Sequence, residues 1–204
     1  MQNNFVITIG YEFGSGGREI ADMVANKLGI KVYDKELIAL IAKNSGMNED
    51  ILREIDEVST NSFLYAVSAG TLTGAHILGG NLPITDKAFI TCSNIIKELA
   101  EKESCVIVGR CSNYVLKGKE NLLTVFIHEE LESRAQKLAK EQGTSVSEAE
   151  SLIKKTDKKR ANYHNYYSDA RWGSRTDYDI CINSKIGLSN VADLIVNAAR
   201  LMQK

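Results

Sequence analysis

The chain is poor in the residues that mark disulfide-rich, zinc-binding and strongly kinked proteins. Its 204 residues include four cysteines, three histidines and one proline. The cysteines are Cys92, Cys105, Cys111 and Cys181, and no two of them have the CxxC spacing of a zinc site. We expect Cys92, Cys105 and Cys181 to be buried free thiols, because each lies in an apolar helix or strand pattern. This cysteine usage favours a reducing, cytoplasmic compartment and predicts no metal site.

Long hydrophobic runs and an excess of one charge are also absent. No apolar run approaches the roughly 20 residues that a membrane-spanning helix needs, so we expect no membrane partner. The first ten residues, MQNNFVITIG, lack the basic region and cleavage pattern of a signal peptide. The formal net charge of −1 argues against a general nucleic-acid-binding protein, although a local basic patch is still allowed.

The chain does contain an alternation of short apolar runs and helical patterns. Hydrophobic residues make up 44% and charged residues 25% of it, the usual balance of a globular domain. Five runs predict strands: Phe5–Ile9, Ile30–Tyr33, Cys105–Val108, Leu122–Ile127 and Tyr178–Asn183. Helical patterns lie at 18–28, 34–41, 47–58, 86–102, 129–142, 145–167 and 189–202. This alternation predicts a single α/β domain over residues 1–204, with a five-stranded parallel sheet in a three-layer α/β/α arrangement.

The first predicted strand leads into a glycine-rich loop within FVITIGYEFGSGGREIA, residues 5–21. Glycines leave room for the backbone N–H groups of residues 14–18 to turn around a phosphate. The helix that follows points its positive end at the same place. Strand, glycine loop and helix therefore predict a P-loop, and the alternative is a glycine-rich turn that binds no ligand. The predicted contacts are Gly14, Ser15, Gly16, Gly17 and Arg18.

The loop lacks the lysine of the P-loop motif, which asks for Gly, four residues, Gly, Lys and then Ser or Thr. With Gly16 as the second motif glycine, the lysine position holds Gly17 and the hydroxyl position holds Arg18. A shift by one residue places Arg18 at the lysine position and Glu19 at the hydroxyl position. Neither register supplies the hydroxyl that usually holds Mg²⁺. We expect Arg18 to supply the missing positive charge.

Two further charged residues directly follow predicted strands, where ligands of parallel sheets gather. Asp34 comes after the second strand and either caps the next helix or contacts a substrate. Arg110 comes after the apolar run Cys105–Val108 and either forms a structural ion pair or clamps an anion. For Arg110 we favour the anion clamp, whereas both roles of Asp34 stay open.

Two segments are candidates for covering a substrate. Residues 146–177 carry a basic run that ends in Arg160, and form a lid-like segment whose charges can neutralise phosphates. The alternative for most of these lysines is a solvated helix face. Residues 45–85 form a possible substrate-covering insertion, and within them 59–85 have no sustained period. For 59–85 a contact between the subunits of a homodimer is equally open, and we interpret His76 as an ordinary polar residue.

Five stretches resemble, in the same order, the cytidylate kinase-like family of nucleoside monophosphate kinases. They are FGSGGREIA, GIKVYDKELI, VIVGR, TDKKRANY and YDICINSKIGLSNVADLI. The resemblance implies a P-loop NTPase-type fold with a helical lid. It also implies a nucleotide-binding phosphotransferase that uses ATP and Mg²⁺ and passes the γ-phosphoryl to a nucleoside monophosphate or a similar small acceptor.

Position by position, the resemblance assigns roles to individual residues. Residues 14–16 match the ATP phosphate loop, and Asp34 matches an aspartate beside the monophosphate site. Arg110 matches the arginine of a Gly-Arg-Asp signature that faces the bound nucleotide. Asp157 and Arg160 match an Asp-x-x-Arg pair of the lid, in which the aspartate resembles a nucleotide sugar contact and the arginine a phosphate contact.

The chain also departs from the family pattern. Gly17 stands at the lysine position, Cys111 replaces an aspartate that reads the base, and Leu40 stands where a further arginine is expected. These losses keep open an alternative function, a nucleotide-binding regulator on a kinase fold that has lost turnover. For the enzyme, the predicted catalytic residues are Arg18, Arg110 and Arg160, and the predicted substrate-binding residues are Asp34, Arg110, Asp157 and Arg160.

Overall fold

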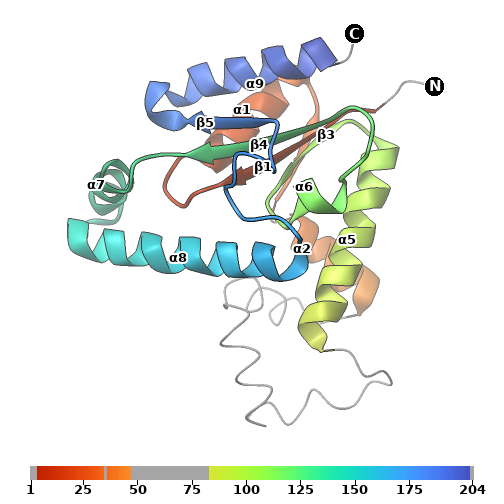
Figure 1. The fold of residues 1–204 in the computed structure, drawn as a ribbon, viewed down its shortest axis with the longest axis horizontal. Helices are drawn as coiled ribbons and strands as arrows, with labels where there is room; N and C mark the ends of the chain where they lie inside the picture. The colour runs from red at the N-terminus through yellow and green to blue at the C-terminus, as the bar shows by residue number, and fades with distance from the viewer. Residues whose placement is uncertain (1–3, 35, 47–82, 203–204) are drawn as a thin grey trace.

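The computed structural model describes residues 4–34, 36–46 and 83–202 (Figure 1). The predicted helix over 47–58, His76 and nearly all of the segment 59–85 lie outside these ranges. Within the described residues, no helix combines the length and the apolar character needed to cross a membrane.

Five parallel strands form the central sheet, in the order β2-β3-β1-β4-β5. They are β1 (Val6–Tyr11), β2 (Lys31–Tyr33), β3 (Cys105–Val108), β4 (Leu122–His128) and β5 (Ile180–Asn183). β1 is central, because Val6 pairs with Cys105 on one side and with Leu122 on the other. The predicted five-stranded parallel sheet is confirmed. All five strands end at one edge of the sheet, which we call the carboxyl edge.

Helices cover both faces of this sheet (Figure 1). α1 and α9 pack on one face against Ile7 and Ile9, whereas α2 and α5 pack on the other against Val6 and Ile107. β1 contributes apolar side chains to both faces, because side chains alternate along a strand, and this explains its nearly continuous apolar sequence. The helices are α1 (Gly17–Leu28), α2 (Glu36–Ser45), α5 (Ile84–Lys102), α6 (Ser112–Val115), α7 (Leu131–Gln142), α8 (Val146–Tyr167) and α9 (Leu188–Met202), with the 3-10 turn η1 (Ser184–Ile186).

α7 and α8 pack on each other and on the glycine loop. Phe13 of the loop packs against their small shared core. A capping box starts α8: Ser145 Oγ accepts from the Glu148 N–H at 3.2 Å, and the Glu148 carboxylate accepts from the Ser145 N–H at 2.9 Å. The last turn of α8 reaches α5, where Tyr167 stacks on Phe89 with ring centroids 4.0 Å apart. α8 therefore spans from the glycine loop to α5 (Figure 1).

One of the three cysteine predictions is wrong. Cys92 and Cys105 are buried free thiols, as expected, but Cys181 is exposed. Cys181 lies on β5, the outermost strand on one side of the sheet. The sequence pattern does not show which strand is outermost. Cys111 is also buried, at the start of α6.

Candidate phosphate-binding site

The glycine loop joins the carboxyl end of β1 to α1 through a tight turn. Ser15 donates both its N–H, at 3.1 Å, and its hydroxyl, at 2.7 Å, to the carbonyl oxygen of Glu12. Gly14 and Gly16 have φ angles of 81° and 74°. Only glycine adopts this left-handed region without steric cost, so the two glycines are a requirement of the turn.

The start of α1 presents N–H groups to the mouth of the loop. Gly16 is the N-cap residue, and no side chain caps the helix. The N–H groups of the first turn have no preceding helical carbonyl to bond, and the helix dipole adds partial positive charge there. The Ser15 N–H and hydroxyl are already used inside the loop, and its side chain is 1% exposed. Fewer groups than the predicted set over residues 14–18 therefore point to a phosphate, because the Ser15 N–H and hydroxyl both bond to Glu12 in this structure.

Gly17, at the lysine position of the motif, is pressed against Tyr11. A Cβ atom built on Gly17 would lie 2.7 Å from Cδ2 of Tyr11 and closer still to Cβ and Cγ. No residue other than glycine fits at position 17 while the Tyr11 ring lies there. This contact gives a steric reason for the missing lysine, which the sequence alone does not supply.

Arg160 of α8 lies over the same tyrosine. Its guanidinium carbon is 4.4 Å from the centroid of the Tyr11 ring, a cation–π distance. Arg160 Nη1 donates to the Tyr11 carbonyl oxygen at 2.9 Å, and Nη2 lies 3.4 Å from the Tyr11 hydroxyl. The structure thus brings Arg160, predicted as a phosphate contact, to the base of the glycine loop.

Asp157 fastens α8 to the loop through a buried arginine that the sequence analysis missed. The Asp157 carboxylate accepts from the Phe13 N–H at 2.8 Å and from Arg134 Nη1 at 2.7 Å. Arg134, on α7, also pairs with Glu12 at 3.2 Å and donates to the Phe13 carbonyl oxygen at 2.9 Å. Arg134 is 5% exposed, so the charges of Asp157 and Glu12 compensate its burial. Asp157, predicted as a sugar contact, holds the loop and two helices together in this structure.

Glu129 is a buried carboxylate at the carboxyl edge, just after β4. It is 4% exposed and accepts hydrogen bonds from Lys137 at 2.6 Å and from Ser184 at 3.1 Å. Its own N–H donates to the Glu12 carboxylate at 3.1 Å. Burial acts to raise the pKa of Glu129, but the hydrogen bonds, led by the one from Lys137, outweigh it and hold the pKa below its usual range. Glu129 therefore stays ionised and ties α7 and η1 to the loop.

Arg18 and Asp34 meet beside the loop. Arg18 Nη1 lies 3.4 Å from the Asp34 carboxylate, and 41% of the Arg18 side chain is exposed. α2 begins at Glu36, two residues beyond Asp34, and the Glu36 carboxylate accepts from the Asp34 N–H at 3.2 Å. The two predicted site residues are therefore brought together, and the charge of Arg18 is directed to Asp34.

Arg110 and Cys111 follow β3 in an unusual backbone conformation. Their φ angles are 57° and 55°, in the left-handed region that non-glycine residues rarely adopt. Such outliers cluster at functional sites, where the surrounding structure maintains them. Burial raises the pKa of the Cys111 thiol to about 12, so the thiol is neutral and does not reproduce the charge of the aspartate in the family signature.

The residues of the loop fit a polyphosphate better than they fit a metal ion. Among the described residues, no three His, Cys, Asp or Glu side chains come together as metal ligands. The buried Ser15 hydroxyl is not available as a magnesium ligand. The two left-handed glycines and the uncapped start of α1, in contrast, form a cradle suited to an anion. A Mg²⁺ ion would therefore be held mainly by phosphate oxygens and water.

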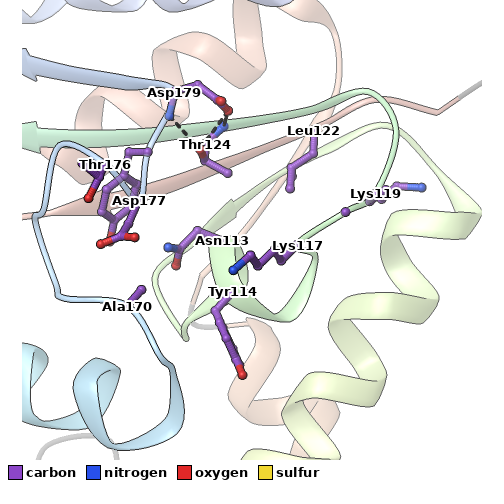
Figure 2. Close-up of a pocket in the computed structure, with 12 residues that line it drawn as sticks. Asn113, Tyr114, Lys117, Lys119, Leu122, Thr124, Ala170, Thr176, Asp177 and Asp179 are labelled. Carbon is purple, nitrogen blue, oxygen red and sulfur yellow. Dashed lines mark hydrogen bonds between the residues drawn. The ribbon is translucent and has the colours of Figure 1, made fainter.

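A separate pocket of about 350 Å³ lies away from these residues. Figure 2 shows Asn113 and Lys117, from α6 and the turn after it, facing Asp177 across the pocket. Thr124, at the back, donates its hydroxyl to Asp179 at 2.8 Å. None of the predicted site residues lines this pocket, so it is not the predicted phosphate site.

The sequence carried a signal for one missed residue but not for the others. Arg134 lies one turn before Leu138 and next to Ala135 on the buried stripe of α7, and a charged residue on an apolar stripe points to a buried ion pair. Tyr11 and Glu12 carry no such signal. Their partners Arg160 and Arg134 are more than 100 residues away along the chain.

Known proteins resemble this chain along nearly its whole length. The model of the cytidylate kinase-like family matches residues 6–186. A cytidylate kinase from Archaeoglobus fulgidus is 27% identical over 201 residues, which cover 96% of this chain and 94% of that protein. A solved structure of an uncharacterised protein from Eubacterium ventriosum has a TM-score of 0.69 and 29% identity, covering 97% of this chain and 99% of that one.

A more distant solved structure shows the fold alone. Shikimate kinase from Bacteroides thetaiotaomicron has a TM-score of 0.53 at 15% identity, covering 96% of this chain and 98% of that one. The three-layer α/β/α arrangement is therefore the one found in P-loop kinases. Because the family match spans most of the residues, the chain belongs to the cytidylate kinase-like family.

Proposed function

We propose that this protein is an ATP-dependent phosphotransferase that passes the γ-phosphoryl group to a nucleoside monophosphate or a similar small acceptor. The observation that carries the proposal is the glycine loop, whose left-handed Gly14 and Gly16 open onto the uncapped start of α1. This arrangement suits a polyphosphate through backbone groups alone. Family membership supports the same reaction class.

On the donor side, the first-turn N–H groups of α1 would bind the ATP phosphates. Bound Mg²⁺ would supply neutralisation of charge on the transferring phosphoryl group, with phosphates and water as its main ligands. The ion pairs of Arg134 with Glu12 and Asp157 would keep the loop rigid, which matters because this chemistry depends mostly on positioning.

On the acceptor side, the Arg18–Asp34 pair and Arg110 would bind and orient the acceptor. Arg18 lies at the start of α1, so it stands between the donor phosphates and Asp34. Arg110 follows β3 directly, at the same carboxyl edge. Two arginines near the transfer path would neutralise charge that develops in the transition state. α8 would serve as the lid, since it already spans from the loop to α5 and would limit the access of water.

A regulator that binds nucleotides without turnover is the second candidate. It is favoured by Gly17 at the lysine position and by Arg18 at the hydroxyl position, because two parts of the usual phosphate and magnesium site are then missing. The ion pairs and the strained Arg110–Cys111 backbone weigh against it. Burying charges and holding non-glycine residues in the left-handed region are both unfavourable in free energy, and a scaffold without catalysis would not need either feature.

Single-turnover transfer from radiolabelled ATP separates the two candidates. Protein in excess over γ-labelled ATP·Mg²⁺ is mixed with one acceptor at a time. The acceptors are the common nucleoside monophosphates and small hydroxy acids. The enzyme predicts labelled product with at least one acceptor. ATP binding without labelled product across the whole panel would favour the regulator instead.

A further inference from the structure

We propose that Arg160 takes the place of the P-loop lysine on the donor phosphates and that Tyr11 is the residue that positions it. This inference rests on the proposed ATP-dependent function. It differs from the expectation from sequence, in which Arg18 supplies the missing charge.

Position 17 has no room for a side chain. A lysine side chain would have to begin at a Cβ atom, and the place of that atom is taken by the Tyr11 side chain. Tyr11 is the last residue of β1 and Gly17 the first residue of α1, so the two residues close the loop from opposite ends. An aromatic ring therefore occupies the space from which the lysine of the motif would extend.

The positive charge of Arg160 lies over the Tyr11 ring. The Arg160 guanidinium lies 4.4 Å from the Tyr11 centroid and 5.6 Å from that of Phe13, so two aromatic residues of the loop face one positive charge. The bond from Arg160 Nη1 to the Tyr11 carbonyl oxygen fixes the direction of the fork. Guanidinium has five N–H donors, and the two contacts with Tyr11 use two of them. With respect to the described residues, the other donors are available for phosphate oxygens, which match a planar fork well.

Arg160 and Arg18, the other candidate for the role of the lysine, differ in how far their charges are already paired. Arg18 is paired with Asp34 at 3.4 Å, so part of its charge is already neutralised by a carboxylate. Arg160 has no carboxylate partner among the described residues, and its contacts are an aromatic ring, a carbonyl oxygen and a hydroxyl. An arginine held in this way keeps its full charge for an anionic ligand. Because Arg160 comes from α8, the helix proposed as the lid would itself contribute a cation to the phosphate site.

The test measures ATP·Mg²⁺ and ADP·Mg²⁺ affinity by titration calorimetry on the full chain. Arg160→Ala should weaken ATP binding by about 10- to 100-fold, the usual loss for one charge-assisted hydrogen bond. Lys158→Ala is the matched control, because Lys158 is an exposed cation on the same helix and should leave the affinity within about two-fold. Melting temperatures without nucleotide show that each variant is folded.

Tyr11 is tested through variants that separate its ring from its hydroxyl. Tyr11→Leu should weaken ATP binding nearly as much as Arg160→Ala, whereas Tyr11→Phe keeps the ring and should stay near the parent value. If Tyr11 had only a structural role, its replacement would lower the melting temperature, but the Leu and Phe variants would bind ATP with the same affinity. Equal ATP affinity of the folded Leu and Phe variants would overturn the role of Tyr11.

A lysine restored at its usual position gives the sharpest outcome. In the double variant Tyr11→Ser/Gly17→Lys, the added lysine should make Arg160 dispensable, so that Arg160→Ala changes ATP affinity by less than about three-fold. An equal loss in both backgrounds, or a loss in the parent no greater than that of Lys158→Ala, would overturn the inference alone. If the parent itself binds no ATP, the inference and the proposed function are both wrong.

Discussion

The donor side and the acceptor side of the proposed site are built in different ways. The donor side is a network of specific contacts in which charged groups from α7 and α8 meet the glycine loop. The acceptor side is more open, and its described ion pair is partly exposed, at 41% for Arg18 and 20% for Asp34. The donor side comprises Tyr11, Glu12, residues 13–17, Arg134, Asp157 and Arg160, and the acceptor side comprises Arg18, Asp34, Arg110 and Cys111.

The difference indicates that the side proposed to bind the donor phosphates is held by more contacts than the side proposed to bind the acceptor. The donor side has lost its lysine, yet a tyrosine and an arginine occupy the vacated space. On the acceptor side, the aspartate of the family signature is replaced by a neutral, buried thiol at Cys111.

The largest effect is expected when the buried arginine of the donor side is removed. Arg134→Met would leave the carboxylates of Asp157 and Glu12 without their main partner, which should lower the free energy of unfolding by about 3 kcal/mol. Urea denaturation measures the loss. Lys140→Met, at an exposed position of the same helix, should change the free energy by less than about 0.5 kcal/mol. A loss below about 1 kcal/mol for Arg134→Met would mean that the donor side is not held together by this network.

A smaller effect is expected from a methyl group in the loop. Gly16→Ala meets both a left-handed backbone and the side chain of Leu188, whose Cδ2 atom would lie 2.5 Å from the new Cβ. We expect a loss of about 2–4 kcal/mol in the free energy of unfolding. Gly143→Ala has a similar φ angle, 68°, but open space around the Cβ, so it should lose only about 1–2 kcal/mol. Equal losses in thermal or urea unfolding would rule out the Leu188 contact as a cause.

The sequence predicts well those features that depend on residues close together in the chain. Gly29 and Gly143 end their helices in left-handed conformations, and the capping box at Ser145 forms, because each depends on neighbours within a few residues. The strands and their parallel arrangement also follow from the apolar runs.

What the sequence does not predict depends on distant parts of the chain. The pairing of Tyr11 with Arg160 joins residues 149 positions apart, and no local pattern marks it. The exposure of Cys181 depends on which strand is at the edge. The roles of Arg18, Arg110 and Asp157 in catalysis and binding stay predictions, although their places in the fold are now known.

A third prediction concerns the contact between α8, the helix proposed as the lid, and α6, which follows Arg110. His164 is 4% exposed, and its Nε2 lies 3.3 Å from Asn113 Oδ1. Burial lowers its pKa below 6.5, so below that pH the unfolded chain binds a proton that the folded chain does not. Stability should therefore fall as the pH drops from 7 to 5.5. His164→Gln, which does not titrate, should flatten this part of the stability profile, and an unchanged slope would contradict the assignment.

The smallest effect is expected in the choice of base. With Cys111 neutral and buried, the protein has no carboxylate at that position to distinguish cytosine from uracil. CMP and UMP should therefore support phosphoryl transfer with kcat/KM values within about three-fold of each other, since only a well-made polar contact gives strong discrimination. A preference for CMP of a hundred-fold or more would show that another residue reads the base.

The most direct test of the central claim is the change in melting temperature on adding ATP·Mg²⁺, compared with adenosine. A ligand that binds only the folded state raises the melting temperature. If the glycine loop binds the ATP phosphates, the melting temperature should rise clearly with ATP, rise little or not at all with adenosine, and rise further when the right acceptor is added. No rise with ATP far above ordinary dissociation constants would contradict the account, and the glycine loop would then be a turn without a ligand.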